Sequence, residues 1–281
     1  MTSRLLARGA IFAAVAAVPC LLVLAPIASF LLLSFFRLED NQIVRDFTFA
    51  NYAGFFGNAT YWGTFLGTLW LCFEVMLFAV LIGYPVAWFV WKRRGRMRYF
   101  LLLLTVLPLF MSYIVKLYTL RSILGLNGLL NQALLGLGIL ERPSLLFLYN
   151  QRAVLLTMVV IYLPFAILPI FLTLERIPRN LLHASSDLGA GPGTTFRRVV
   201  LPLSLPGTIA GALFVFVLAL GDFVTPQMVG GTSGFTFGRV IWSQFGLAYN
   251  WPFGAAMAGI LLATALGVIA LAGYAASLRR V

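Results

Sequence analysis

The last apolar stretch of the chain runs from Pro252 to Leu278 and reads PFGAAMAGILLATALGVIALAGYAASL. It contains no Asp, Glu, Lys or Arg, and its apolar residues form one block rather than a helix-face or strand pattern. Crossing the hydrocarbon core of a bilayer takes about 20 apolar residues in a helix. The stretch is therefore long enough to predict a membrane-spanning helix with some tilt.

Five more blocks of this kind occur along the chain, which predicts an all-α membrane protein with six transmembrane helices. The six segments cover residues 10–36, 63–91, 99–120, 153–174, 205–229 and 253–277. The composition agrees, because 61% of the 281 residues are hydrophobic and 10% are charged. A soluble domain with so few charges would expose an apolar surface and aggregate. The first block is too long for the core of a signal peptide, so we interpret it as a retained helix.

The formal net charge of +12 reflects membrane topology rather than binding of nucleic acid. If the amino terminus is cytoplasmic and the chain crosses six times, most Lys and Arg residues fall on the cytoplasmic side, and this bias sets the orientation of membrane proteins. We therefore expect both termini in the cytoplasm. The basic residues on that side are Arg4, Arg8, Lys92, Arg93, Arg94, Arg96, Arg98, Arg176, Arg179, Arg197, Arg198, Arg279 and Arg280.

The connection between the fourth and fifth predicted helices, residues 175–204, is too structured to be a simple turn. Pro178 suits the first position of a helix, where its missing N–H is not needed. Gly189 provides a stop for that helix, because glycine readily adopts the conformation found just after helix ends. A second short helix starting near Pro192 is expected to end at Leu201-Pro202, before the fifth membrane helix.

One motif in this connection has a specific spacing. His183-Ala184-Ser185 is followed by three residues, Gly189, nine residues and then Val199-Val200-Leu201-Pro202. The spacing resembles the cytoplasmic signature E-A-A, three residues, G, nine residues, I-x-L-P of permeases of binding-protein-dependent ABC importers. The chain departs from the signature at three positions, with His183 for Glu, Ser185 for Ala and Val199 for Ile.

The resemblance implies that this loop forms a coupling helix, which docks into a groove on a cytoplasmic ATPase. Small residues permit close approach to a partner surface, and glycine lets the backbone reverse. The alternative is an amphipathic helix lying among the lipid headgroups. The residues to which the resemblance assigns ATPase coupling are His183, Ala184, Ser185, Asp187, Gly189, Val199, Leu201 and Pro202.

Three further stretches are similar to permeases of the spermidine/putrescine group. They are LGDFVTP at 220–226 before Gly230-Gly231, SYIVK at 112–116 before residues 121–130, and Phe245-Gly246-Leu247 before NWPF at 250–253. The resemblance covers nearly the whole chain and implies a single permease domain over residues 1–281, with the type I ABC importer fold. It also implies half of a pathway for a polyamine. Other small solutes, namely opines or other amino-acid derivatives, phosphonates, thiamine and ferric iron, are the alternatives.

The resemblance further implies the partners and the location. The partners are a dimer of ABC ATPases, a second, homologous permease, a periplasmic substrate-binding protein and the lipid bilayer of a bacterial inner membrane. The chain has no Walker A sequence, so ATP and Mg²⁺ are expected on the partner chains, with no cofactor and no catalytic residue in this one. A secondary transporter is the rival, but the internal repeats common in that class are not seen.

Three ionisable residues, Glu74, Lys116 and Asp222, fall inside predicted helices. Each costs about 3 kcal/mol if it faces lipid, so each is expected to face the bundle interior or a wet cavity. Glu74 and Asp222 are candidates for attracting a cationic substrate, beside aromatic rings that bind ammonium groups. Alternatively, Glu74 neutralises Lys116, Asp222 caps or braces a broken helix end, and Lys116 snorkels to the surface. The predicted substrate-pathway residues are Glu74, Tyr113, Lys116, Asp222 and Phe223.

Small and sulfur-containing residues allow two further expectations. The pairs Gly63/Gly67 and Gly207/Gly211 have the spacing that permits close packing of membrane helices. Cys20 and Cys72 lie within predicted helices and are read as packing residues. His183 is the single histidine, and we therefore expect no metal site.

Overall fold

The computed structural model describes residue 15 and residues 17–278. In this part of the chain, four helices are long and apolar enough to cross a membrane, and a bent pair can count as a fifth. The amino-terminal portion of the first predicted segment lies outside the described residues. Its described portion contains η1 (Cys20–Leu24) and α2 (Ala25–Leu33). The four long spans are Ala59–Lys92, Gln151–Glu175, Pro192–Gly221 and Trp251–Tyr274.

The third predicted segment, residues 99–120, does not form one straight helix. It contains α5 (Arg96–Val106), η2 (Leu107–Phe110) and α6 (Tyr113–Leu124). The direction changes by 101° between the helical stretch that ends at Phe110 and the one that starts at Tyr113. Two features explain the break. Pro108 has no N–H to donate within the helix, and Met111 has an extended backbone, with φ −80° and ψ 144°.

Contacts group the chain into two compact units, which we describe separately. The first combines the described residues up to Trp62 with Val240–Ala263. It contains an antiparallel hairpin of β1 (Arg37–Glu39) and β2 (Gln42–Val44), followed by α3 (Ala50–Gly57).

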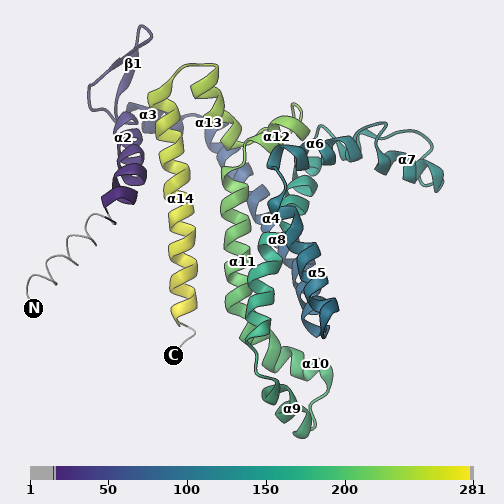
Figure 1. The fold of residues 1–281 in the computed structure, drawn as a ribbon. Coiled ribbons are helices and arrows are strands. Elements are labelled where there is room, and N and C mark those ends of the chain that lie inside the picture. The colour runs from purple at the N-terminus through teal and green to yellow at the C-terminus, as the bar shows by residue number, and fades with distance from the viewer. Residues whose placement is uncertain (1–14, 16, 279–281) are drawn as a thin grey trace, which may run out of the picture. The chain divides into compact units, whose positions relative to one another are not determined.

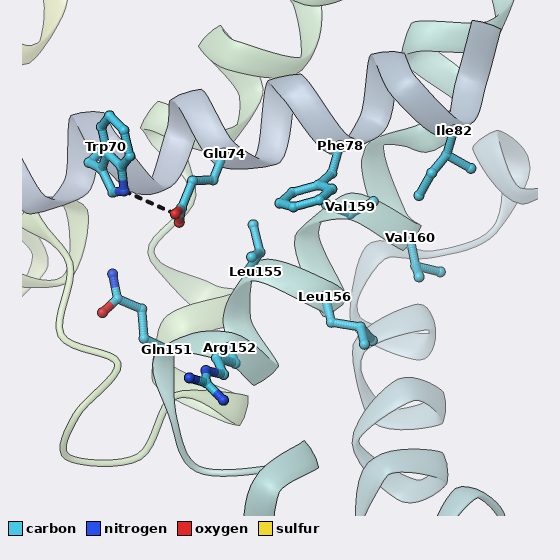
Figure 2. Close-up of a pocket in the computed structure, with 10 residues that line it drawn as sticks. All are labelled: Trp70, Glu74, Phe78, Ile82, Gln151, Arg152, Leu155, Leu156, Val159 and Val160. Atoms are coloured by element: carbon cyan, nitrogen blue, oxygen red, sulfur yellow. Dashed lines mark hydrogen bonds between the residues drawn. The ribbon is translucent and has the colours of Figure 1, made fainter.

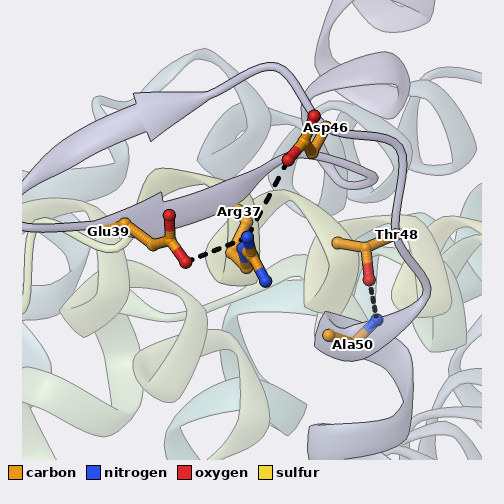
Figure 3. A network of polar contacts seen from close by, with 5 residues as sticks. All are labelled: Arg37, Glu39, Asp46, Thr48 and Ala50. Atoms are coloured by element: carbon orange, nitrogen blue, oxygen red, sulfur yellow. Dashed lines mark hydrogen bonds and ion pairs between the residues drawn. The ribbon is translucent and has the colours of Figure 1, made fainter.

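Polar contacts fix the hairpin to the segment that follows it. Arg37 pairs with Glu39 at 2.9 Å and with Asp46 at 3.8 Å (Figure 3). At the start of α3, the hydroxyl of Thr48 accepts a hydrogen bond from the backbone N–H of Ala50 at 3.1 Å. A side-chain oxygen at this position satisfies a donor that the first helical turn leaves without a partner.

The second unit, Gly63–Arg239 with the described residues from Thr264 onward, contains the packed helices that position the sites. Its main helices are α4 (Ala59–Lys92), α8 (Gln151–Glu175) and α11 (Leu201–Gly221), and Figure 1 shows α8 and α11 side by side. Gly211 of α11 lies so close to α8 that an added Cβ would be 2.8 Å from the carbonyl oxygen of Ala166. Gly207 is similarly pressed against Pro169 and Thr173. The pair therefore makes the close helix contact that its spacing predicts.

The connection from α8 to α11 contains α9 (Arg179–Asp187), α10 (Pro192–Thr195) and the π-helix η4 (Phe196–Val200). The prediction that Leu201-Pro202 ends the second short helix differs from the structure, because helical backbone continues from Pro192 to Gly221. The N–H of Leu201 donates to the carbonyl of Phe196, five residues earlier. Because of this wider turn, the helix continues through Pro202, although Pro202 has no N–H to donate.

The remaining elements are short, except for the last helix. They are α7 (Leu129–Gly136), η3 (Leu145–Phe147), α12 (Val224–Val229), α13 (Phe237–Gly246) and α14 (Trp251–Leu278). Asp222 and Phe223 separate α11 from α12, so the fifth predicted segment is broken near its end.

Candidate functional site

The predicted coupling loop projects beyond the ends of α8 and α11, where Figure 1 places α9 and α10. Leu182 of α9 and Phe196 of η4 pack against a cluster of buried apolar residues and so anchor the loop. His183, Ala184 and Asp187 are exposed. The buried cluster consists of Ala87, Val90, Ile167, Ile170, Phe171, Leu174, Ile177 and Val200.

The end of α9 is a tight reversal at Gly189. Its φ of +77° is in the left-handed region, which disfavours residues with a Cβ. Gly189 N–H donates to the Ser186 carbonyl at 2.9 Å, and Ala190 N–H donates to the Ser185 carbonyl at 3.0 Å. The reversal leaves Leu188 with 88% of its surface exposed. The loop therefore presents a rigid turn with an apolar tip.

A side-chain contact ties the two short helices of the loop together. The hydroxyls of Ser185 and Thr195 are 2.9 Å apart and share a hydrogen bond. Ser185 thus faces the loop interior, whereas Ala184 faces outward. Val199 lies in η4 and Leu201-Pro202 begins α11, so these signature residues lie at the base of the loop.

Asp222 occupies the break between α11 and α12, and its side chain is nearly enclosed, with 8% of the residue exposed. One carboxylate oxygen accepts hydrogen bonds from Tyr113 at 2.6 Å and from Tyr162 at 2.9 Å. The other accepts from the backbone N–H groups of Val224 and Thr225, each at 3.0 Å. The carboxylate therefore joins α6 and α8 to the first turn of α12, in the manner of a helix cap.

The other pathway candidates near this break are only partly enclosed. Phe223 is half-buried directly after Asp222. The amine of half-buried Lys116 lies 6.0 Å from the ring centre of Tyr113, a cation–π distance. Within the described part of the chain, no ion pair joins Lys116 to Glu74, so the proposed mutual neutralisation is not seen.

Glu74 lies on a different surface, a groove between α4 and α8 with a volume of about 730 Å³. Its carboxylate accepts a hydrogen bond from the indole N–H of Trp70 at 2.9 Å. Figure 2 shows Arg152 across the groove from this pair, and Phe78 farther along α4. The walls are otherwise mainly apolar, and they are formed by Trp70, Glu74, Phe78, Ile82, Gln151, Arg152, Leu155, Leu156, Val159 and Val160.

The described residues were expected to contain few metal-ligating side chains close together. Across residue 15 and residues 17–278, no three His, Cys, Asp or Glu side chains are grouped closely enough to hold an ion. The candidate sites are an exposed turn, a hydrogen-bonded helix break and an amphipathic groove.

Residues 77–281 match the family described as binding-protein-dependent transport system inner membrane component. The chain belongs to this family. It is a permease subunit of an ABC importer, a multi-pass transport component of the inner membrane.

Curated relatives align with most of the permease. It is 35% identical over 245 residues to the spermidine/putrescine transport system permease protein PotB of Escherichia coli (strain K12), covering 87% of this chain and 88% of that one. Against PotB of Haemophilus influenzae the identity is 38% over 240 residues, covering 85% and 81%. The inner membrane ABC transporter permease protein YdcU of Escherichia coli (strain K12) is 36% identical over 261 residues, covering 88% and 80%.

Two solved structures share the permease fold. A chain of a bacterial ABC transporter involved in the import of the acidic polysaccharide alginate aligns with a TM-score of 0.78 and 15% identity, covering 99% of this chain and 97% of that one. A chain of the MetNI methionine ABC transporter, in an inward-facing conformation, gives a TM-score of 0.58 and 17% identity, covering 77% and 96%. The predicted ABC importer permease fold is thereby confirmed.

Three residues of the permease that the sequence reasoning missed take part in these sites. Tyr162 and Thr225 surround Asp222, and Arg152 lies in the groove with Glu74. A usable signal existed for Tyr162, because a tyrosine within an apolar helix usually finds a partner for its hydroxyl. Arg152 lies just before the predicted segment 153–174, but it is in the first turn of α8.

Proposed function

We propose that the permease forms half of a pathway that imports a polyamine, such as spermidine or putrescine. The observation that carries this proposal is the likeness to two PotB proteins at 35% and 38% identity over more than four fifths of the chain. The groove beside Trp70 supports it, because a carboxylate next to aromatic faces attracts an ammonium group. Arg152 of α8 lines the same groove and repels an ammonium group. The attraction is therefore confined to the side of the groove formed by α4, which carries Glu74.

In the proposed assembly, a second permease completes the pathway and a periplasmic protein delivers the substrate. Two ATPase subunits bind ATP and Mg²⁺ and engage the exposed α9 turn from the cytoplasm, the side on which we also propose that both termini lie. Nucleotide shifts the permease between inward- and outward-open states only through contacts that differ between those states. The exposed turn with Leu188 at its tip offers such a contact.

The function is tested with the intact complex. The tagged chain is purified from its native membranes, its partners are identified by mass spectrometry, and the complex is reconstituted in proteoliposomes. We expect ATP-dependent uptake of radiolabelled spermidine or putrescine in the presence of the cognate binding protein. Uptake of 2-aminoethylphosphonate or thiamine, with neither polyamine transported, would contradict the polyamine assignment and leave the importer assignment intact.

Replacing Gly189 with Leu is expected to reduce uptake at least tenfold and to weaken ATPase binding. A side chain at a φ of +77° costs about 1–2 kcal/mol, and the turn relieves this strain by changing shape. Uptake and the amount of copurified ATPase are measured, with membrane insertion as a check. Gly189→Asn, which tolerates this conformation, and Gly193→Leu, at a site with open space, are the controls. Full transport by Gly189→Leu would refute the coupling role.

Replacing Glu74 with Gln is expected to raise the KM for spermidine uptake about tenfold, because a neutral amide attracts an ammonium group less than a carboxylate does. Assembly with the ATPase is expected to remain intact, since Glu74 accepts one hydrogen bond, from Trp70 on its own helix. Glu74→Asp retains the charge and serves as the matched control. If the KM is the same for Gln and Glu at this position, the groove lies off the substrate path.

A further inference from the structure

A second cavity, of about 320 Å³, lies at the foot of the coupling loop. It is bounded by the end of α4, the turn that leads into α5, the end of α8 and the first part of α9. Six of its ten lining residues have basic side chains. The lining residues are Trp91, Lys92, Arg93, Arg94, Arg98, Glu175, Ile177, Arg179, Leu182 and His183.

Much of the positive charge in this basic pocket is not neutralised by ion pairs among the described residues. Glu175 is the one acidic residue in the lining, and it pairs with Arg98. Arg94 and Arg179 make no ion pair in the part of the chain that the structure describes, and both are exposed. A cavity lined by cations that have no anion of their own favours an anionic ligand.

The apolar part of the lining indicates the depth of the pocket in the membrane. Trp91 lies in the last turn of the membrane-spanning helix α4, and its ring centre is 5.4 Å from that of Trp88. Tryptophan pairs at helix ends mark the headgroup level of a bilayer. Ile177 and Leu182 add apolar side chains to the lining. The pocket therefore combines apolar and cationic surfaces where a membrane helix ends.

We propose that the basic pocket binds a phosphate group, supplied by the headgroup of an anionic phospholipid in the leaflet on the coupling-loop side. Arginine side chains bind phosphate oxygens through paired N–H donors, and basic pockets between membrane helices bind such headgroups. A bound headgroup would bridge the α4–α5 turn at Arg94 and the coupling helix at Arg179. It would thus hold the foot of the coupling helix.

With His at position 183, the pocket is more favourable for an anion than it would be with the Glu of the ABC permease signature. The signature has Glu at this position, and a carboxylate there would add a second negative charge to the wall beside Glu175. The proposal does not rest on the polyamine assignment, because the binding test below involves no transported substrate.

The test measures lipid retention by the purified full-length chain with native mass spectrometry. Phosphatidylglycerol, phosphatidylcholine and inorganic phosphate are added in separate arms. We expect retention of phosphatidylglycerol, and a decrease on the order of tenfold in its affinity in the double variant Arg94→Gln/Arg179→Gln, because each cation near an anionic headgroup contributes attraction. His183→Glu is expected to weaken retention as well.

The matched control is Arg96→Gln/Arg176→Gln, which removes two exposed cations from the same two connections but outside the pocket. Its affinity for phosphatidylglycerol is expected to stay within twofold of the original. Four results would overturn the proposal. The first is an equal loss of phosphatidylglycerol affinity in both double variants, and the second is retention of phosphatidylcholine equal to that of phosphatidylglycerol. The third is displacement of the lipid by millimolar inorganic phosphate. The fourth is an unchanged lipid affinity of Arg94→Gln/Arg179→Gln together with loss of copurified ATPase. The last would assign the pocket to a protein contact.

Discussion

Replacing Asp222 with Ala is expected to lower the free energy of unfolding of the permease by about 4 kcal/mol. The substitution removes an acceptor shared by two tyrosine hydroxyls and two backbone N–H groups, in a position where 8% of the residue is exposed. Each buried donor left without a partner costs about 1–3 kcal/mol. The break between α11 and α12 would also lose its carboxylate contacts with Tyr113 and Tyr162, while Tyr113 keeps its hydrogen bond with the hydroxyl of Thr225. Thermal unfolding of the purified complex measures the effect.

Conservative variants separate this bracing role from substrate contact. Tyr162→Phe removes one donor and keeps the carboxylate, so a loss of about 1 kcal/mol is expected. Asp46→Ala, at an exposed acid in the first unit, is the control and is expected to change stability by less than about 0.5 kcal/mol. An Asp222→Ala protein with unchanged unfolding but a raised KM for spermidine would instead assign Asp222 to the substrate path.

Replacing Gly207 with Leu is expected to disrupt the contact between α8 and α11. An added Cβ collides with Thr173 and with the carbonyl of Pro169, and both belong to α8, which cannot retreat without losing its own packing. Overpacking of this kind costs roughly 3 kcal/mol or more. We expect poor recovery of folded protein and a lowered unfolding temperature, measured by fluorescence-detected size-exclusion chromatography before and after heating.

The other glycine pair supplies the control. Gly63 and Gly67 have the same spacing on α4, but an added Cβ at either position meets nothing within 4 Å. Gly63→Leu is therefore expected to leave the isolated chain stable. Equal destabilisation by Gly207→Leu and Gly63→Leu would show that glycine spacing, rather than the α8–α11 contact, determines the outcome.

Much of the coupling loop was predictable because its determinants are local. Gly189 was expected to stop a helix, and it does so with a φ of +77°. The break at Asp222 was also anticipated as one of two alternatives for that residue. The bend of 101° before Tyr113 was not, since Pro108 predicts a possible kink but not its size, which depends on the helices that pack around it.

The amino-acid sequence by itself determined that this is a membrane protein of several helices with a signature loop, because hydrocarbon length, helix-ending glycine and motif spacing act over neighbouring residues. Tertiary structure alone decided which distant side chains meet. Tyr162 and Asp222 are 60 positions apart and share a hydrogen bond, and Arg152 lies across a groove from Glu74. The packing of helices against each other sets such encounters, and the periodicity of a uniformly apolar helix does not reveal which face is packed.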